Sequence, residues 1–335
     1  MSGGMLEESG DSHVTDAERA FLIMWSIFTL TLCVPGNLLV LISSIKYQAI
    51  KLDKITVILM NNVAVGDIGY ALFWVLPTIY SIATDKVLLD NFTHGVSCKL
   101  LVQARYIFAA VSIFSMVSLN ISKLTCLLFP FRSRLRTKRA GYKLVVFLWV
   151  LELFARFSSE VTSVVQRGEF METVYEPLVY GCKYIISNNR TELYEIIFTA
   201  VSITVTFGST FLIFITTVWL IFYVHKVRGI QKESLITLIA VSSVFMLSYL
   251  PLVLYFCAQF FGLSLPLWFT KFSNLIPFLN YAANPIIYFL TVKSFGMYVK
   301  NNFMRIRDPV AVLVSSAARS VTAGVRRAAT STTNV

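Results

Sequence analysis

Long apolar stretches with few polar interruptions dominate the pattern of this chain. Windows of about 19 residues locate seven of them. They lie near residues 21–45, 55–81, 99–129, 142–165, 195–224, 235–261 and 267–290. Nearly all exceed the roughly 20 residues that a helix needs to cross a hydrocarbon core of about 30 Å, and none shows the alternation of a transmembrane strand. Because only helices and closed barrels satisfy the backbone in lipid, the pattern predicts an all-α membrane protein, a bundle of seven transmembrane helices.

Composition and segment boundaries agree with a membrane bundle. Of the 335 residues, 56% are hydrophobic and 14% are charged, which leaves too little polar surface to coat a soluble globular domain. We expect the membrane domain over residues 21–305, between a polar, acidic N-terminal segment at residues 1–20 and a flexible tail at residues 306–335. We expect no secretory signal peptide before Phe21. The absence of an internal repeat gives no support to an inverted-repeat transporter.

The charged residues predict the orientation of the bundle. The connections on one side are basic: Lys46, Lys51 and Lys54; Arg132, Arg134, Arg136, Lys138, Arg139 and Lys143; Lys226, Arg228 and Lys232; and a tail from Lys293 to Arg327. The other side carries Glu7, Glu8, Asp11, Asp16, Glu18, Glu169, Glu172, Glu176 and Glu192. The basic side is expected to face the cytoplasm, with the N-terminus outside a plasma membrane. The net charge of +11 is therefore mainly a topology signal with some attraction to anionic membrane lipids, and no nucleic-acid partner is expected.

Glycosylation sequons and cysteines agree with this orientation. Asn91 and Asn189 each begin an acceptor sequon in a segment assigned to the outside. A third match, at Asn120, lies inside an apolar run and is read as chance. Of five cysteines, only Cys98 and Cys182 fall at the oxidising face, and we expect them to pair and tie the second outer loop to the third helix.

Landmark residues at six of the seven runs resemble those of the rhodopsin-like (class A) G-protein-coupled receptors. They are Pro35-Gly36-Asn37, Asn62 and Asp67, Cys98 and Pro130-Phe131-Arg132, Trp149, Phe245 with Ser248-Tyr249-Leu250-Pro251, and Asn284-Pro285-Ile286-Ile287-Tyr288. The resemblance covers residues 21–305 and implies a receptor in which an extracellular small molecule or peptide acts on a heterotrimeric G protein. It assigns coupling and switch roles to Lys123, Phe245, Pro251, Pro285 and Tyr288. No nucleotide loop, metal cluster or catalytic triad is visible, so no enzymatic activity is expected.

Polar residues inside the bundle give a candidate ion site. By resemblance, Asp67, Ser112, Asn280 and Asn284 occupy the positions that hold a sodium ion in this family, with Asn37 nearby. An uncompensated carboxylate at mid-membrane costs at least about 2.5 kcal/mol, so Asp67 needs partners. The alternatives are a purely structural polar network and a protonated Asp67.

Two departures from the family pattern affect the coupling residues. Ser122-Lys123-Leu124 stands where the third helix of the family has Asp/Glu-Arg-Tyr, and Lys offers a point charge where Arg offers a fork. The acidic partner on the sixth helix is replaced by Gln231, although Glu233 is a possible substitute. The hypothesis is a weakly latched receptor with raised basal signalling. The rival is a receptor that couples poorly, such as a non-signalling scavenger, and a transporter or channel is a third reading.

Arg105 is the residue that gives most information about the ligand. It lies two helical turns below Cys98, where amine receptors of this family carry Asp, and a cation there repels amines and favours a carboxylate or phosphate. An internal ion pair with Glu152 or Glu160 is an equal alternative. The expected ligand-binding residues are Arg105, Phe108, Tyr249, Asn274 and Phe278. Because Phe278 stands where the opsins carry the lysine that binds retinal, no covalent retinal is expected; the sodium ion is the one cofactor considered.

Smaller features complete the prediction. Lys293 to Arg307 is amphipathic and resembles the short eighth helix of the family, with Phe295 at the expected place. Tyr249 replaces the usual tryptophan of the sixth helix, and its hydroxyl needs a partner when it is buried. Residues 207–211 contain no proline, which leaves the bulge of the fifth helix in doubt, although Gly208 can provide a bend. The final residues, Thr330 to Val335, offer hydroxyls that arrestin could read after phosphorylation and a C-terminal ligand for a PDZ domain.

Overall fold

A computed structural model describes most of the apolar part of the chain. The described residues are 16–46, 48, 50, 52–84, 86, 96–129, 137–167, 173–176, 181–184, 207–226, 230–260, 263 and 265–302. The expected N-terminal segment up to residue 15, the sequons at Asn91 and Asn189, the Pro130-Phe131-Arg132 landmark and the tail from residue 303 lie outside them.

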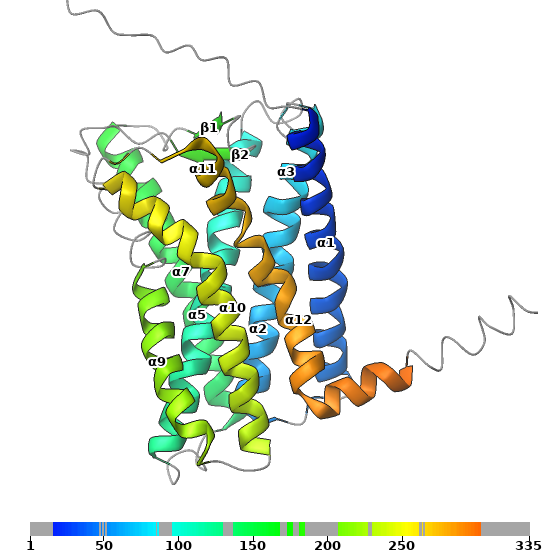
Figure 1. Cartoon of the computed structure of the whole chain (residues 1–335). Coiled ribbons are helices and arrows are strands. Elements are labelled where there is room, and N and C mark those ends of the chain that lie inside the picture. The colour runs from blue at the N-terminus through cyan, green and yellow to red at the C-terminus, as the bar shows by residue number, and fades with distance from the viewer. Residues whose placement is uncertain are drawn as a thin grey trace, which may run out of the picture.

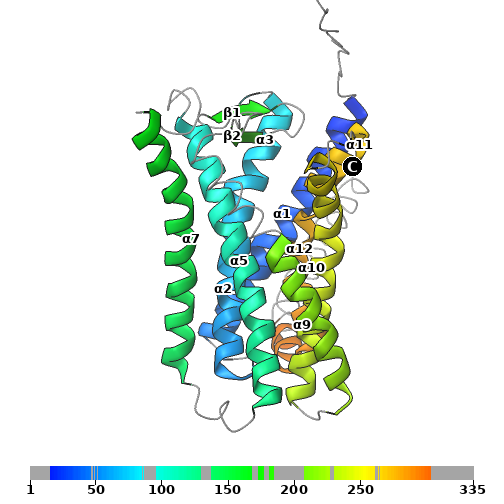
Figure 2. The same cartoon turned by 90° about the vertical axis from the view of Figure 1, so that its left-hand side faces the viewer.

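The described chain is a bundle of long helices that run side by side (Figures 1 and 2). The helices are α1 (Asp16–Ile45), α2 (Lys54–Tyr70) continued by η1 (Ala71–Val75) and α3 (Leu76–Thr84), α5 (Val96–Leu128), α7 (Lys138–Arg167), α9 (Ser209–Val224), α10 (Ile230–Phe260), α11 (Leu267–Leu275) and α12 (Phe278–Thr291). Each predicted apolar run coincides with one of these helical segments, and the fifth run is described from residue 207 onward. The all-α prediction is confirmed.

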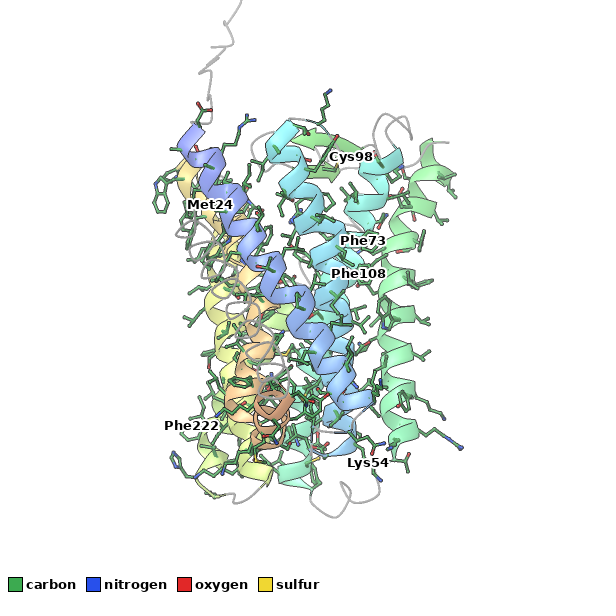
Figure 3. The ribbon with its side chains drawn as sticks, turned by 90° about the vertical axis from the view of Figure 1, so that its right-hand side faces the viewer. Met24, Lys54, Phe73, Cys98, Phe108 and Phe222 are labelled. Atoms are coloured by element: carbon green, nitrogen blue, oxygen red, sulfur yellow. A yellow bond between two sulfur atoms is a disulfide. The ribbon has the colours of Figure 1, made fainter. Side chains whose placement is uncertain are left out.

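Length and composition identify membrane-crossing helices within the described residues. Four qualify alone: Asp16–Ile45, Lys54–Thr84, Ser97–Leu128 and Lys232–Tyr255. A fifth qualifies as a bent pair, Trp268–Thr291 with Lys293–Asn302. Large apolar side chains point outward along the bundle, such as Met24 at 63% and Phe222 at 70% exposure (Figure 3). A water-soluble monomer rarely exposes so much contiguous apolar surface, so the outer face of the bundle is suited to lipid.

A short hairpin closes one end of the bundle and was not predicted. Strands β1 (Thr173–Glu176) and β2 (Gly181–Tyr184) pair antiparallel, with Tyr175 opposite Cys182. A disulfide joins Cys182 to Cys98 at the start of α5, with 5.4 Å between the two Cα atoms, as expected. We call this end the disulfide end, and the opposite end, where α2 begins at Lys54, the basic end.

Glycines allow the central helices to approach closely. A Cβ on Gly36 would lie 2.9 Å from the Pro285 ring, so α1 and α12 touch at their backbones. A Cβ on Gly69 would lie 2.1 Å from Phe108, and one on Gly66 would lie 3.0 Å from Ser112, so α2 and α5 are fitted together over more than a turn. A larger residue in place of any of these glycines would displace a neighbour.

Prolines and local bulges shape the helices. In η1 the N–H of Leu76 bonds back to the carbonyl of Ala71, which makes one wide turn just before Pro77. Pro has no N–H to continue the regular pattern, and the wide turn leaves Trp74 buried while Phe73 is 43% exposed. A wide turn also stands at Phe207–Gly208, so the fifth helix has a bulge without a proline.

The eighth helix is present. Lys293–Asn302 turns by 95° from α12, and it extends sideways at the basic end in Figure 1. Phe295 is 1% exposed and packs into the bundle, whereas Met297 is 61% exposed. This division matches a helix lying along a membrane surface.

Candidate functional site

Arg105 lies on α5 in the half nearer the disulfide end. Its guanidinium carbon is 3.7 Å from the centre of the Trp74 ring and 5.6 Å from that of Tyr106, and the side chain is half-buried. Both contacts are cation–π contacts, and the guanidinium also forms a hydrogen bond with the Tyr70 hydroxyl. Because a guanidinium carries five N–H groups, others can still bind an anion. The bulge in η1 presents Trp74 to Arg105.

The two carboxylates that could have neutralised Arg105 are engaged elsewhere. Glu152 accepts from Arg156 at 2.5 Å, and both side chains are at most 2% exposed. Glu160 accepts from Gln103 at 2.9 Å and lies 3.9 Å from Lys99. Among the described residues, no carboxylate lies within ion-pair distance of Arg105, so the internal ion-pair alternative is not the arrangement of this structure.

A group of buried aromatic residues connects the Trp74 region to α10. The hydroxyls of Tyr249 and Tyr281 lie 2.6 Å apart, so the predicted partner of the Tyr249 hydroxyl is on α12. Tyr281 stacks on Tyr70 at 4.0 Å, and Phe278 meets Tyr70 edge-on at 6.1 Å. We call Tyr70, Trp74, Tyr249, Phe278 and Tyr281 the aromatic chain; Phe278 and Tyr281 pack in one cluster with Tyr70 and Trp74. Tyr70 was not predicted as a site residue, because nothing in a uniformly apolar run distinguishes it from a packing residue.

Other expected ligand residues lie apart from this group. Phe108 stacks on Phe73 at 5.4 Å, is edge-on to Trp149 at 5.7 Å, and fills the space beside Gly69, as Figure 3 shows for Phe73 and Phe108. The amide of Asn274 donates to the carbonyl of Thr270 in its own helix. The structure therefore places Phe108 in the packing between α2, α5 and α7, and does not bring Asn274 to Arg105.

Asp67 lies at the centre of the bundle and is fully buried. Its Oδ1 accepts from the Ser112 hydroxyl at 2.6 Å, and its Oδ2 accepts from the Asn284 amide at 2.7 Å. The Asn280 Oδ1 is buried without a hydrogen-bond partner. Two of the expected residues, Ser112 and Asn284, thus meet the Asp67 carboxylate, and carboxylate, hydroxyl and amide oxygens are the type of ligand that hard cations prefer.

Lys123 near the basic end of α5 is paired with an unexpected acid. Its ammonium donates to Asp53 Oδ2, and the Lys123 side chain is 12% exposed. Asp53 also caps α2 by accepting from the backbone and hydroxyl of Thr56. Burial raises the pKa of the Asp53 carboxyl, but the Lys123 charge and the hydrogen bonds from Lys123 and Thr56 outweigh burial and lower that pKa.

Glu233 does not substitute for the missing acidic partner of Lys123, and that expectation is wrong. The Glu233 carboxylate accepts from the backbone N–H of Lys293 at 2.7 Å. Near it, the hydroxyls of Thr237 and Thr291 lie 2.8 Å apart. Both contacts tie the basic end of α10 to the end of α12 and the eighth helix. The 95° turn leaves the N–H of Lys293 without a helical partner, and the Glu233 carboxylate accepts from it.

A neutral link joins α5 to α10 instead. The Asn120 amide donates to the Ser242 hydroxyl at 3.0 Å, and Ser242 lies 3.3 Å from the Asn120 carbonyl oxygen. Both residues are fully buried. Asn120 was predicted only to be a chance sequon, although a polar residue inside an apolar run is itself a signal of a hydrogen bond between helices.

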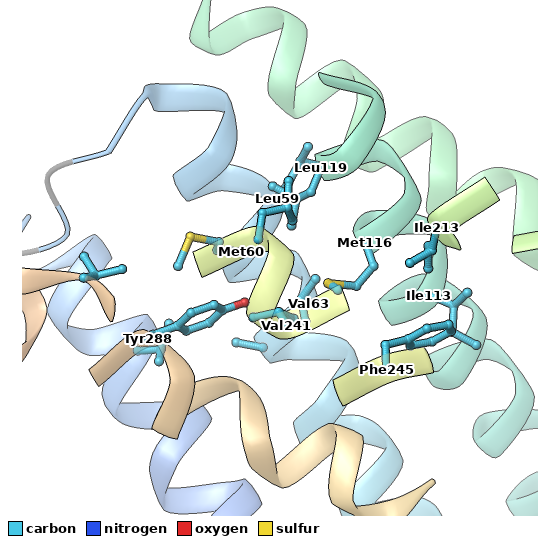
Figure 4. Close-up of a cluster of buried hydrophobic side chains, with 14 of the residues drawn as sticks. Leu59, Met60, Val63, Ile113, Met116, Leu119, Ile213, Val241, Phe245 and Tyr288 are labelled. Carbon is cyan, nitrogen blue, oxygen red and sulfur yellow. The ribbon is translucent and has the colours of Figure 1, made fainter. Parts of the chain in front are cut away.

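The basic half of the bundle is closed in this conformation. Phe245 and Tyr288 belong to a tight apolar cluster with Met60, Met116 and Val241 (Figure 4). Beside it lies a hollow of about 10 Å³, which has room for about one water molecule and is bordered by Lys123, Ser234 and Tyr288. The hollow has no room for a segment of another protein in this conformation.

Comparison with known proteins decides the family. Residues 36–288 match the model of the 7 transmembrane receptor (rhodopsin family). The chain belongs to this family. The seven-helix architecture and the multi-pass membrane location follow from membership, as the landmark residues predicted, and the transporter or channel reading is not favoured.

Peptide receptors are among the similar proteins. The chain is 26% identical over 157 residues to human Neuropeptide FF receptor 1, covering 47% of the chain and 35% of that receptor. It is 25% identical over 278 residues to zebrafish (Danio rerio) Galanin receptor 2a, covering 80% and 74%, and 24% identical over 301 residues to mouse Neuropeptide FF receptor 2, covering 80% and 69%. The match thus spans about a third of the length of Neuropeptide FF receptor 1.

Proposed function

We propose that this rhodopsin-family receptor conveys the binding of an extracellular ligand to a heterotrimeric G protein. The disulfide end faces outside and the basic end faces the cytoplasm, in the plasma membrane. The support for this orientation is the segregation of Lys and Arg to the connections at the basic end. Arrestin and a PDZ domain are further proposed partners, on the pattern of the residues from Thr330 to Val335, and anionic lipids are proposed for the basic end.

The ligand presents an anionic group to Arg105. The observation that carries this proposal is a half-buried guanidinium that rests on Trp74 and Tyr106 while the nearby carboxylates are paired with other cations. A guanidinium that is not paired with a carboxylate of the protein binds a ligand carboxylate or phosphate in two-point contact. Neuropeptide FF receptors are named for a peptide, so a peptide with an acidic side chain or a free C-terminal carboxylate is the ligand class that we favour.

Activation follows from the aromatic chain. A bound anion draws the Arg105 guanidinium away from Trp74, and the stacked rings of Tyr70 and Tyr281 pass this displacement to the shared hydroxyl contact with Tyr249. Tyr249 lies two residues before Pro251, where α10 lacks a regular hydrogen bond and can pivot. The pivot separates Ser242 from Asn120 and opens the hollow at Lys123 to the partner.

Screening of anionic ligands tests the function. Receptor in nanodiscs would be mixed with purified heterotrimers and with peptides in matched free-acid and amidated forms, and with carboxylate- and phosphate-bearing metabolites and lysolipids. We expect free acids to accelerate GDP release, and Arg105→Ala to lose that response by about 100-fold in concentration. Arg105→Lys, which keeps the charge without the fork, is the matched control and should retain part of the response. An active ligand with no anionic group, or full activity in Arg105→Ala, would contradict the proposal.

Asp67 and its neighbours hold a sodium ion in the resting receptor. Asp67, Ser112 and Asn280 supply the oxygens, and the unpartnered Asn280 Oδ1 is the atom that a cation would satisfy. Bound to these oxygens, the ion would supply a positive charge that compensates Asp67. We expect the melting temperature of the receptor to be higher in sodium chloride than in choline chloride, and Asp67→Asn to remove the difference. Equal melting temperatures for the wild type in both salts would favour a structural network or a protonated Asp67.

A further inference from the structure

Lys123 has a counter-ion that the family pattern does not provide for. Lys123 comes from α5 and Asp53 from the segment before α2, so the pair joins two helices that are already fitted together at Gly66 and Gly69. The pair therefore adds little restraint between α5 and α10, the helix that has to move. The pair instead affects Lys123 itself. Asp53 compensates the charge of the ammonium and keeps the ammonium out of the adjacent hollow.

The surroundings of Lys123 require an anion at all times. The side chain is 12% exposed, and the hollow beside it is bordered by Leu52, Met60, Met116, Leu119, Leu238 and Val241. An ammonium that leaves Asp53 and enters this apolar space unpaired loses its solvation without compensation. Asp53 can give up the pair more easily, since its side chain is 45% exposed and rehydrates in place.

We propose that Asp53 is the resting counter-ion of Lys123, and that the cytoplasmic partner couples by bringing a carboxylate that replaces Asp53. The surface fits a helix with an apolar face and one acidic group near its tip: the apolar face meets Met60, Met116 and Leu238, and the acidic group meets Lys123. Asp53 then determines how easily a partner is accepted. This inference rests on the proposed signalling function.

The double role of Asp53 allows a clean variant. Asp53→Asn keeps a good N-cap for α2 and removes the charge that holds Lys123, whereas Asp53→Ala removes both. Glu233→Gln is the matched acidic control, since Glu233 accepts from a backbone N–H and not from Lys123. Lys54→Gln is the control for the loss of an exposed cation beside the pair.

Two measurements on full-length receptor in nanodiscs test the proposal without any ligand. The first is acylation of Lys123 by an acetyl N-hydroxysuccinimide ester, followed by mass spectrometry; the second is GDP release from purified heterotrimers. We expect Asp53→Asn to raise both about fivefold, and Glu233→Gln and Lys54→Gln to raise neither. The exchanged pair, Asp53→Lys with Lys123→Asp, restores opposite charges but loses the N-cap of α2, so it should melt no lower than Asp53→Ala. It should nevertheless release no more GDP than empty nanodiscs, because it presents an anion to an anionic partner.

Each of the other outcomes overturns a specific part of the proposal. Equal acylation of Lys123 in wild type and Asp53→Asn would show that the pair does not form. Raised acylation with unchanged GDP release would show that Asp53 does not control coupling, and coupling by the exchanged pair would exclude a partner carboxylate. If acylation rises but no heterotrimer responds to any form, including the wild type with the anionic panel, the signalling function itself fails and the exchange step fails with it.

Discussion

Helix α5 carries one partly buried cation towards each end, and the two differ in their partners. Arg105 rests on the faces of aromatic rings without a carboxylate, while Lys123 is held by Asp53. A buried cation without an anion is an energetic cost that a bound ligand can remove, whereas a paired cation has to be released before it can act. Among the described residues, the cation nearer the disulfide end therefore lacks a carboxylate partner, whereas the cation nearer the basic end already has one.

Breaking the buried Glu152–Arg156 pair gives the strongest test of this contrast between paired and unpaired cations. Arg156→Met leaves the Glu152 carboxylate, 1% exposed, without its cation, and we expect a loss of about 3–5 kcal/mol in the free energy of unfolding. The double variant Arg156→Met with Glu152→Leu should recover most of that loss. Denaturant unfolding of detergent-solubilised receptor measures both. A single variant as stable as the wild type would mean that Glu152 is not held as a buried charge.

The contact between α2 and α5 positions both cations. Arg105 and Lys123 lie on α5, and their partners Trp74 and Asp53 lie at the two ends of α2. Gly69→Val places a Cβ 2.1 Å from the Phe108 ring, and we expect a loss of about 2–3 kcal/mol from overpacking. Gly69→Val with Phe108→Ala restores space and should recover part of the loss. Thermal unfolding in the presence of a thiol-reactive dye is a suitable measurement. A well-tolerated Gly69→Val would show that the two helices are less closely fitted than the structure has them.

The neutral link between α5 and α10 should matter more for signalling than for stability. Asn120→Val and Ser242→Ala each break the contact, with a loss of about 1 kcal/mol in stability. We expect each variant to raise ligand-free GDP release about fivefold. The double variant should add little to either single one, because both remove the same contact. Additive effects would show that the two residues act separately.

Removal of Arg105 should have almost no effect on the empty receptor. Arg105→Met loses cation–π contacts with Trp74 and Tyr106 but leaves no carboxylate unpaired, so the unfolding free energy should change by less than about 1 kcal/mol. The contrast with Arg156→Met is the informative quantity, measured under the same unfolding conditions. If Arg105→Met cost as much as Arg156→Met, a carboxylate partner of Arg105 would be indicated.

The smallest effect is the pH dependence of the Asp53–Lys123 pair. The pKa of Asp53 is lowered from its usual value of 3.8, so its stabilising contribution is complete above that value and is lost as the pH falls below it through the lowered pKa. Because the side chain is 45% exposed, the contribution is small. Melting curves between about pH 6 and pH 3 should show a slightly steeper loss in wild type than in Asp53→Asn. Parallel curves would show that the Asp53–Lys123 pair does not contribute to stability.

Periodicity and landmarks were enough to predict the bundle. The apolar runs predicted all the described transmembrane segments, because in lipid the length of an apolar run sets the position of a helix. The contacts of Ser112 and Asn284 with Asp67 could also be anticipated, since polar residues in apolar runs are few and have to meet one another, whereas the sodium ion itself stays a prediction. The eighth helix followed in the same way from its amphipathic pattern.

Pairings of charges could not be predicted, because they depend on the rotation of helices relative to one another. Glu152 and Arg156 were recognised as neighbours on one helix. Only the packing of α7 against α5 shows that Glu152 pairs with Arg156 and not with Arg105. Asp53 lies outside every apolar run and is distant from Lys123 in sequence, so no pattern connects them. The hairpin of β1 and β2 was missed because two four-residue strands leave too short a pattern.

The rate of GDP release from purified heterotrimers of each Gα class, with wild-type receptor and Lys123→Gln compared in nanodiscs, tests the central claim most directly. The account predicts that an anionic ligand accelerates release through the wild type for at least one class and that Lys123→Gln does not respond. Identical rates with receptor, variant and empty nanodiscs, after a ligand has been shown to bind at Arg105, would contradict it.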